Sequence, residues 1–151
     1  MKLTTLDRKK FEIRYPDRQI SIFTLEPYGP VEIEYSGSIL HKLRPASPQT
    51  SLQALPEFKE IVVCGTPFQA KVWQALLTIP AGCTVSYSDI AKQVGHVNAV
   101  RAVGSAIGAN PIGILLPCHR VIAKDGSLGG FAWGLELKKK WLALESTKVR
   151  P

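Results

Sequence analysis

Residues 41–60 interrupt the regular patterning of the chain, because they contain three prolines and no sustained hydrophobic period. Proline fixes φ and donates no backbone hydrogen bond, so a run of this composition is typical of a connector. We therefore predict a domain boundary here. The first domain covers residues 1–60 and ends in the proline-rich connector, and the second covers residues 61–151.

The two parts differ in their hydrophobic period. Before the connector, apolar and polar residues alternate over 11–15, 19–23 and 31–35, with turn residues between these runs. Such alternation predicts strands of a small antiparallel sheet. After the connector, apolar residues recur at helical spacing. The expected fold is therefore α+β: a small N-terminal α/β domain followed by a mostly helical, winged-helix-like domain that contains a helix-turn-helix.

Helix caps place the expected helices of the second domain. Thr66 and Gln69 can form a capping box around a proline at the first helical position, which predicts a helix that stops before Pro80. A second capping box, Ser86 with Asp89, predicts a short helix that ends at Gly95. Residues 95–98 form the turn that follows it.

A third helix is expected over residues 99–107, capped by Asn98, with Val100, Val103 and Ile107 as its apolar stripe. Helix, short turn and helix follow the plan of a helix-turn-helix. Arg101 and Ser105 are predicted to face outward, among small residues that allow a partner to approach closely: Ala102, Gly104, Ala106 and Gly108.

Size and charge limit the classes of function. The 151 residues are 45% hydrophobic and 21% charged, which is ordinary globular composition, and no apolar run approaches the roughly 18 residues of a membrane span. The N-terminus lacks the apolar region of a secretion signal, so we expect a cytoplasmic or nucleoid-associated location, nuclear in a eukaryote, and no membrane partner. The formal charge is +7, and residues 65–151 hold ten basic and four acidic residues. A polyanion, nucleic acid first, is the expected partner.

One thiol has neighbours suited to nucleophilic chemistry. The apolar run 112–116 is predicted to be a buried strand stopped by Pro117, and Cys118, His119 and Arg120 follow at once. An imidazole or a fixed positive charge raises the fraction of reactive thiolate. Adjacent side chains on a strand point to opposite faces, so this pair can cooperate only if Pro117 breaks the extended path or a water bridges them. The other two cysteines, Cys64 and Cys83, lack such neighbours and are expected to be structural, with no metal site.

An ordered set of motifs resembles the O6-alkylguanine-DNA alkyltransferases over residues 64–146. The set comprises GTPFQ at 65–69, VWQAL at 72–76, IP at 79–80, VSY at 85–87, AVRAVG at 99–104, NP at 110–111, PCHRV at 117–121, DGS at 125–127 and WG at 133–134. Residues 1–60 agree with that family only in their small-sheet character.

The resemblance implies an irreversible, single-turnover transfer of an alkyl group from guanine O6 in DNA to Cys118, with thymine O4 as a further candidate substrate. No cofactor is implied. By resemblance, His119 takes the thiol proton through a water, Glu145 holds that histidine, and Asn110 braces the turn that carries the nucleophile.

The resemblance also assigns DNA contacts and a pocket. Arg101 would fill the space left by a flipped nucleotide in duplex DNA bound through the minor groove, with Tyr87, Ala102, Gly104 and Ser105 beside it. The expected pocket residues are Tyr87, Val121, Gly129, Gly130, Phe131, Ala132 and Trp133. Ala132 stands where many members have a polar residue and has no side-chain donor for guanine O6, so Tyr87 is expected to carry more of that role.

Three alternatives stay open at the level of sequence. The chain could be a non-catalytic binder of alkylated DNA, as in the alkyltransferase-like proteins, although these lack the cysteine. It could be a DNA-binding regulator with Cys118 as a buried hydrophobe, or a cysteine hydrolase using Cys118, His119 and Glu145. We expect a monomer in free solution.

Overall fold

The computed structural model describes residues 1–149, with side chains described up to Ser146. Two compact units are present: residues 1–70 together with 111–113, and residues 71–110 together with 114 onward. The boundary expected near residue 60 precedes this division, and the strand at Glu60–Cys64 lies in the first unit.

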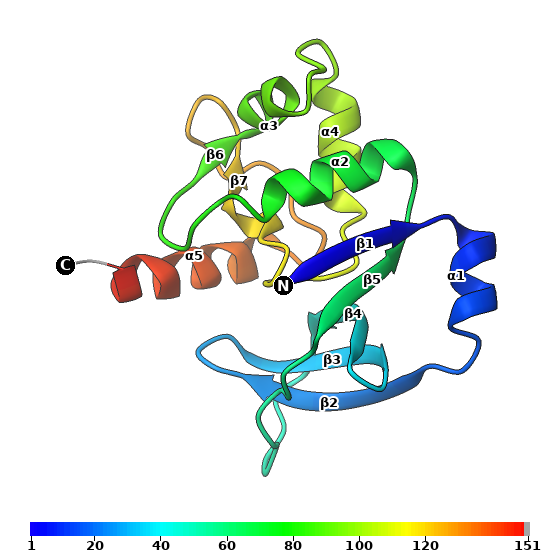
Figure 1. Cartoon of the computed structure of the whole chain (residues 1–151). Helices are drawn as coiled ribbons and strands as arrows, with labels where there is room; N and C mark the ends of the chain where they lie inside the picture. Colours follow the sequence, from blue (N-terminus) through cyan, green and yellow to red (C-terminus); the bar gives the residue numbers. More distant parts are fainter. Residues whose placement is uncertain (150–151) are drawn as a thin grey trace. The chain divides into compact units, whose positions relative to one another are not determined.

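The first unit is built on a five-stranded mixed sheet with the order β1-β5-β4-β3-β2 (Figure 1). Its strands are β1 (Lys2–Leu6), β2 (Gln19–Leu25), β3 (Gly29–Ser36), β4 (Ile39–Pro45) and β5 (Glu60–Cys64). Strands β2 and β3 pair antiparallel, as predicted, and β3 also pairs antiparallel with β4. Strand β5 pairs parallel with both β1 and β4. The α+β class is confirmed.

Burial explains the pattern of the inner strands. In β3, Val31 and Ile33 are 1% exposed while the glutamates that alternate with them are half-buried, which is the period-2 signature of a one-sided sheet. Residues 61–63 of β5 are all buried, as expected of a strand covered on both faces. Other buried side chains of this unit are Leu3, Phe11, Leu40, Leu43, Phe58 and Ile112.

The strand expected at residues 11–15 is wrong, because the chain forms helix α1 (Arg8–Arg14) there. Asp7 caps this helix by accepting a hydrogen bond from the backbone N–H of Lys10 at 2.9 Å. Phe11 is buried whereas Ile13 is 71% exposed. The two apolar residues therefore do not share a face, so the alternation of apolar and polar residues here does not reflect a strand.

The expected connector is also shorter than the sequence suggested, because His41 to Pro45 belong to β4. Leu40 and Leu43 are fully buried there. Their packing in the core keeps the chain in a strand up to Pro45, although the composition of this stretch suggested a connector. Part of the remaining connector lies along β2. The N–H of Thr24 donates to the carbonyl of Gln53 at 2.9 Å, and the N–H of Leu55 donates to the carbonyl of Thr24 at 2.8 Å.

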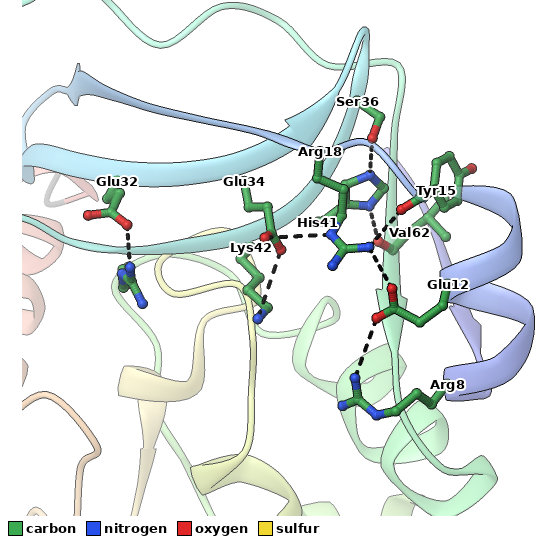
Figure 2. Close-up of polar contacts among 11 residues, drawn as sticks. Arg8, Glu12, Tyr15, Arg18, Glu32, Glu34, Ser36, His41, Lys42 and Val62 are labelled. Atoms are coloured by element: carbon green, nitrogen blue, oxygen red, sulfur yellow. Dashed lines mark hydrogen bonds and ion pairs between the residues drawn. The ribbon is translucent and has the colours of Figure 1, made fainter.

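A polar network joins α1 to this sheet (Figure 2). The Arg18 guanidinium donates to Glu12 at 3.1 Å and to the Tyr15 carbonyl at 2.6 Å, and lies 3.5 Å from the Glu34 carboxylate. Behind it, buried His41 bonds to the Val62 carbonyl through Nδ1 and to the Ser36 hydroxyl through Nε2, both at 2.8 Å. Since a carbonyl only accepts, Nδ1 carries a proton. Burial lowers the pKa of His41.

The second unit is mainly helical. It contains most of α2 (Pro67–Leu76), then α3 (Tyr87–Gln93), α4 (Val100–Gly108) and α5 (Leu135–Val149), with the short parallel pair β6 (Val85–Ser86) and β7 (Val121–Ile122) (Figure 1). Its buried apolar residues include Val72, Trp73, Leu76, Ile90, Ala91, Val103, Ala106, Ile107, Leu116, Val121 and Trp141. None of the helices in the described part of the chain is long and apolar enough to cross a bilayer.

Both predicted capping boxes are confirmed. The backbone N–H of Thr66 donates to the Gln69 side chain at 2.9 Å, and the N–H of Gln69 donates back to the Thr66 hydroxyl at 3.1 Å. Ser86 and Asp89 make the same reciprocal pair at the start of α3. Gly95, at φ +80°, follows α3 in the left-handed conformation that glycine adopts without strain.

Two expectations for α4 are wrong. Asn98 does not cap it, since the N-cap is Ala99 and makes no side-chain hydrogen bond. Val100 is 36% exposed, while Val103 and Ile107 are buried, so the apolar stripe begins one turn later than expected. Val100 stands in the first turn, where the helix has not yet entered the core.

The buried strand expected at 112–116 is also wrong in form. The segment is buried, but the backbone turns at residues 113–115, where Ile114 has φ +68°. Only Ile112 pairs with a strand, through an isolated bridge to Leu43. An apolar run of this length marks burial and leaves the backbone path open.

Candidate active site

A sharp turn presents Cys118. The Asn110 side chain donates from Nδ2 to the Leu116 carbonyl at 2.8 Å, and the Cys118 N–H donates to the same carbonyl at 2.7 Å. After Pro117 the chain enters a 3₁₀ turn, Cys118–Arg120. The extended path is therefore broken at Pro117, so the objection that neighbouring side chains on a strand face opposite ways does not apply here.

The imidazole beside the thiol is held by an ion-pair network in the core. His119 Nε2 lies 2.7 Å from Glu145 Oε2, and the two side chains are 0% and 2% exposed. Arg120 donates to both oxygens of the same carboxylate, from Nε at 2.9 Å and from Nη2 at 2.7 Å. The carboxylate accepts, so Nε2 of His119 carries a proton, and Nδ1 is the ring nitrogen that can take up a further one.

Electrostatics leave the Cys118 sulfur mostly protonated at neutral pH. Burial raises the pKa of the Cys118 thiol, and the hydrogen bond from Asn110 and the charge of Lys138 act in the opposite direction. A thiol in this state needs a proton acceptor before it can attack. Burial also raises the pKa of Tyr87, with a further contribution from Cys118, so this phenol stays a hydrogen-bond donor.

Cys118 opens into a cavity of about 310 Å³. This volume lies at the small end of the range for ligand pockets. The cavity is lined by Tyr87, Gly104, Ile107, Gly108, Asn110, Cys118, Gly130, Phe131, Ala132 and Trp133. Of the predicted pocket residues, Val121 and Gly129 are not part of the lining. Val121 is buried in β7, and Gly129 packs against the Tyr87 ring.

An aromatic cluster forms one wall of the cavity. Phe131 meets Trp133 edge to face, with 5.5 Å between ring centroids, and meets Trp141 at 5.6 Å. Trp141 in turn packs on the His119 ring at 5.4 Å. The wall and the imidazole are therefore parts of one packed unit.

Lys138 belongs to the site, although sequence reasoning missed it. It is 0% exposed, and its Nζ donates to the carbonyls of Leu128 and Gly130. Three successive lysines at 138–140 look like a solvated face. The signal was available in the spacing, because Lys138, Trp141 and Glu145 follow at i, i+3 and i+7 and share the buried face of α5.

The outer face of α4 carries the predicted DNA contacts. Arg101, Ala102 and Ser105 are exposed, and Gly104 is half-buried and lines the cavity. Ala106, expected among the small outward residues, is buried, and its carbonyl accepts the Trp73 indole N–H at 2.8 Å. A second pocket beside α3 is lined by Ser86, Ser88, Asp89, Lys92, Val97 and Lys124.

Other reactive groups are dispersed. All three cysteines are free thiols, and Cys83 is exposed rather than packed in the core. Within residues 1–149, no cluster of three or more His, Cys, Asp or Glu side chains is placed to hold a metal ion.

Comparison with known proteins decides the family. A family model described as the 6-O-methylguanine DNA methyltransferase DNA-binding domain matches residues 67–147. A methylated-DNA–protein-cysteine methyltransferase of Salmonella typhimurium is 41% identical over 133 residues, covering 85% of this chain and 76% of the relative. The chain belongs to the methylated-DNA–protein-cysteine methyltransferase family.

Two further comparisons support this family assignment. The Mycobacterium leprae relative is 55% identical over 96 residues, which is 63% of this chain and 58% of that protein. The match therefore spans less than two thirds of the length of that relative. A crystal structure of Mycobacterium tuberculosis OGT in complex with DNA superposes with a TM-score of 0.72 at 38% identity, covering 85% of this chain and 93% of that one.

Proposed function

We propose that this protein repairs DNA by moving an alkyl group from O6 of guanine to Cys118 in a single turnover. The observation that carries the proposal is the cavity lined by Cys118, whose neighbour in the chain, His119, bonds to the buried Glu145 carboxylate. Family membership supports the reaction class, and the relative of known structure that binds DNA supports the partner.

The chemistry follows from the protonation states. A water relays the Cys118 proton to Nδ1 of His119, while Glu145 stabilises the imidazolium that forms. The sulfur then attacks the alkyl carbon; the S–C bond forms and the C–O6 bond breaks, with its electron pair left on the purine. A proton returns to N1, so guanine is restored. Water does not cleave the resulting thioether, and the protein is spent after one event.

The purine must leave the helix to reach the sulfur, at a cost of a few kcal/mol. Arg101, exposed on a helix face of small residues, fills the vacated space from the minor groove. Tyr87 donates a hydrogen bond to the purine and contacts the phosphate side of the flipped nucleotide. The backbone carbonyls of Cys118 and Val121 accept hydrogen bonds from the amino group of guanine. Thymine O4 is a further substrate of the same site.

The protein acts as a monomer in free solution, on duplex DNA, in the cytoplasm or on the nucleoid (the nucleus in a eukaryote). It needs no cofactor, since the leaving purine and the sulfur supply all the electrons. Phosphate contacts make binding weaker as salt rises.

Intact-mass analysis after incubation with an O6-methylguanine duplex tests the transfer. We expect one added methyl group on Cys118, no addition in Cys118→Ser, and no second turnover. Unchanged mass with retained tight binding to the damaged duplex would instead support the non-catalytic binder. Repeated turnover of an acyl ester would support the hydrolase.

A further inference from the structure

Lys138 is a lysine placed where lysines are rarely found. Its side chain is completely buried, and within residues 1–149 no carboxylate lies within ion-pair distance of its ammonium group. Lysine is almost never fully buried unless it is paired, because removing the charge from water is costly. The ammonium is therefore held for a reason other than a salt bridge.

Its direct partners are backbone carbonyls of one irregular segment. Nζ donates to the Leu128 carbonyl at 2.5 Å and to the Gly130 carbonyl at 3.1 Å. Residues 128–130 form no helix or strand, so these carbonyls lack the partners that regular structure provides. The cavity wall, Phe131 to Trp133, follows directly. The lysine thus fixes the backbone from which the wall begins.

The same ammonium lies near two residues that line the cavity. It is 5.9 Å from the centroid of the Tyr87 ring and 5.8 Å from that of Phe131, within cation–π range. Tyr87 also donates to the Gly130 carbonyl at 3.4 Å, so the two side chains share an acceptor. The positive charge therefore lies beside two aromatic rings, those of Tyr87 and Phe131, that line the same cavity as Cys118.

We propose that Lys138 is a positioning residue of the transfer reaction: its ammonium group fixes the loop that forms the cavity wall and favours the thiolate form of Cys118. The inference rests on the proposed function and adds a charged group to it. The effect on the sulfur is electrostatic, and burial of the thiol makes a compensating positive charge more effective than it would be in water. The interaction is reciprocal, since Cys118 raises the pKa of Lys138 while burial lowers it.

Other groups around the sulfur set the background for this effect. Tyr87 on α3 and Asn110 after α4 face the thiol through the cavity, and both are uncharged at neutral pH. On the 3₁₀ turn and α5, His119 and Arg120 are bonded to the Glu145 carboxylate. Arg120 is thus paired with Glu145, whereas the charge of Lys138 lowers the pKa of the Cys118 thiol against the larger effect of burial.

The experiment measures the thiol without DNA. In a background with Cys64→Ser and Cys83→Ser, the rate of Cys118 modification by iodoacetamide is followed by intact mass between pH 6 and 10. Lys138→Gln keeps hydrogen-bond donors but removes the charge. We expect the pH profile to move upward by about one unit and the rate at pH 7.5 to fall about tenfold. The matched control Lys139→Gln, exposed on the same helix, is expected to keep the wild-type profile.

Two further measurements separate charge from folding. Lys138→Arg keeps charge and donors and is expected to retain the wild-type pH profile, and methyl transfer by Lys138→Gln is expected to recover as pH rises. A folded Lys138→Gln with an unshifted profile overturns the proposal, as does a Lys138→Arg profile shifted as far as that of Lys138→Gln. Because iodoacetamide needs no damaged base, this result is independent of whether the wild type accepts a methyl group from DNA.

Discussion

Replacing Arg120 by methionine should destabilise the fold through Glu145. The carboxylate accepts one hydrogen bond from His119 and two from Arg120, and its side chain is 2% exposed. Methionine retains the apolar stem but removes the guanidinium charge and its two hydrogen bonds from the buried carboxylate. Removing one partner of a buried pair costs about 3–5 kcal/mol. The bond from Arg120 to the Ile79 carbonyl, at 2.6 Å, adds about 1 kcal/mol.

Because Arg120 is 12% exposed, water can partly solvate the carboxylate it leaves behind, and the expected loss is about 3 kcal/mol. For a chain of this size that loss lowers Tm by about 6–12 °C. Urea and thermal unfolding followed by tryptophan fluorescence measure it, with exposed Lys140→Met as the control.

A second substitution tests the cause. Glu145→Gln in the Arg120→Met background removes the unpaired charge and should recover at least about 1 kcal/mol of the loss. If Arg120→Met costs less than about 1 kcal/mol, or if the two substitutions simply add, the carboxylate is not held by the guanidinium and the reasoning is refuted.

Three further outcomes are expected. Asn110→Ala should lower the free energy of unfolding by about 1–3 kcal/mol, because the Leu116 carbonyl loses its side-chain donor; a loss below about 0.5 kcal/mol in urea unfolding would contradict this. The folded-state pKa of His41 is lowered, so only the unfolded chain binds its proton as pH falls through about 6.5, and stability should drop there; a His41→Gln variant with the same pH dependence would refute the assignment. Arg101→Ala should lose repair of a damaged duplex while still accepting a benzyl group from free O6-benzylguanine, and equal loss on both substrates in a mass assay would make Arg101 structural.

Local chemistry made parts of this structure predictable. The capping boxes at Thr66 and Ser86 depend on residues three apart, and the alternation in β3 records one buried face. The nucleophile was indicated by Pro117 and the two residues that follow Cys118, since they meet within one turn of chain.

What could not be predicted depends on packing between distant residues. Alternation at 11–15 suggested a strand because nothing local shows that Ile13 faces solvent. Burial at 112–116 was evident, but the left-handed conformation of Ile114 is imposed by its surroundings. In the sequence, Lys138 resembles the two exposed lysines that follow it. Its burial is explained by the hydrogen bond from its ammonium group to the Gly130 carbonyl, which the sequence does not reveal.

The chain path has a consequence for the modularity of this protein. Residues 111–113 belong to the first unit, where the Leu43 N–H donates to the Pro111 carbonyl and the Gly113 N–H donates to the Leu43 carbonyl. These three residues come just after Asn110, and the last of them lies five positions before Cys118. A gene fragment that begins at residue 71 would encode every group of the cavity, yet it would omit the strand on which the segment leading to the nucleophile is anchored.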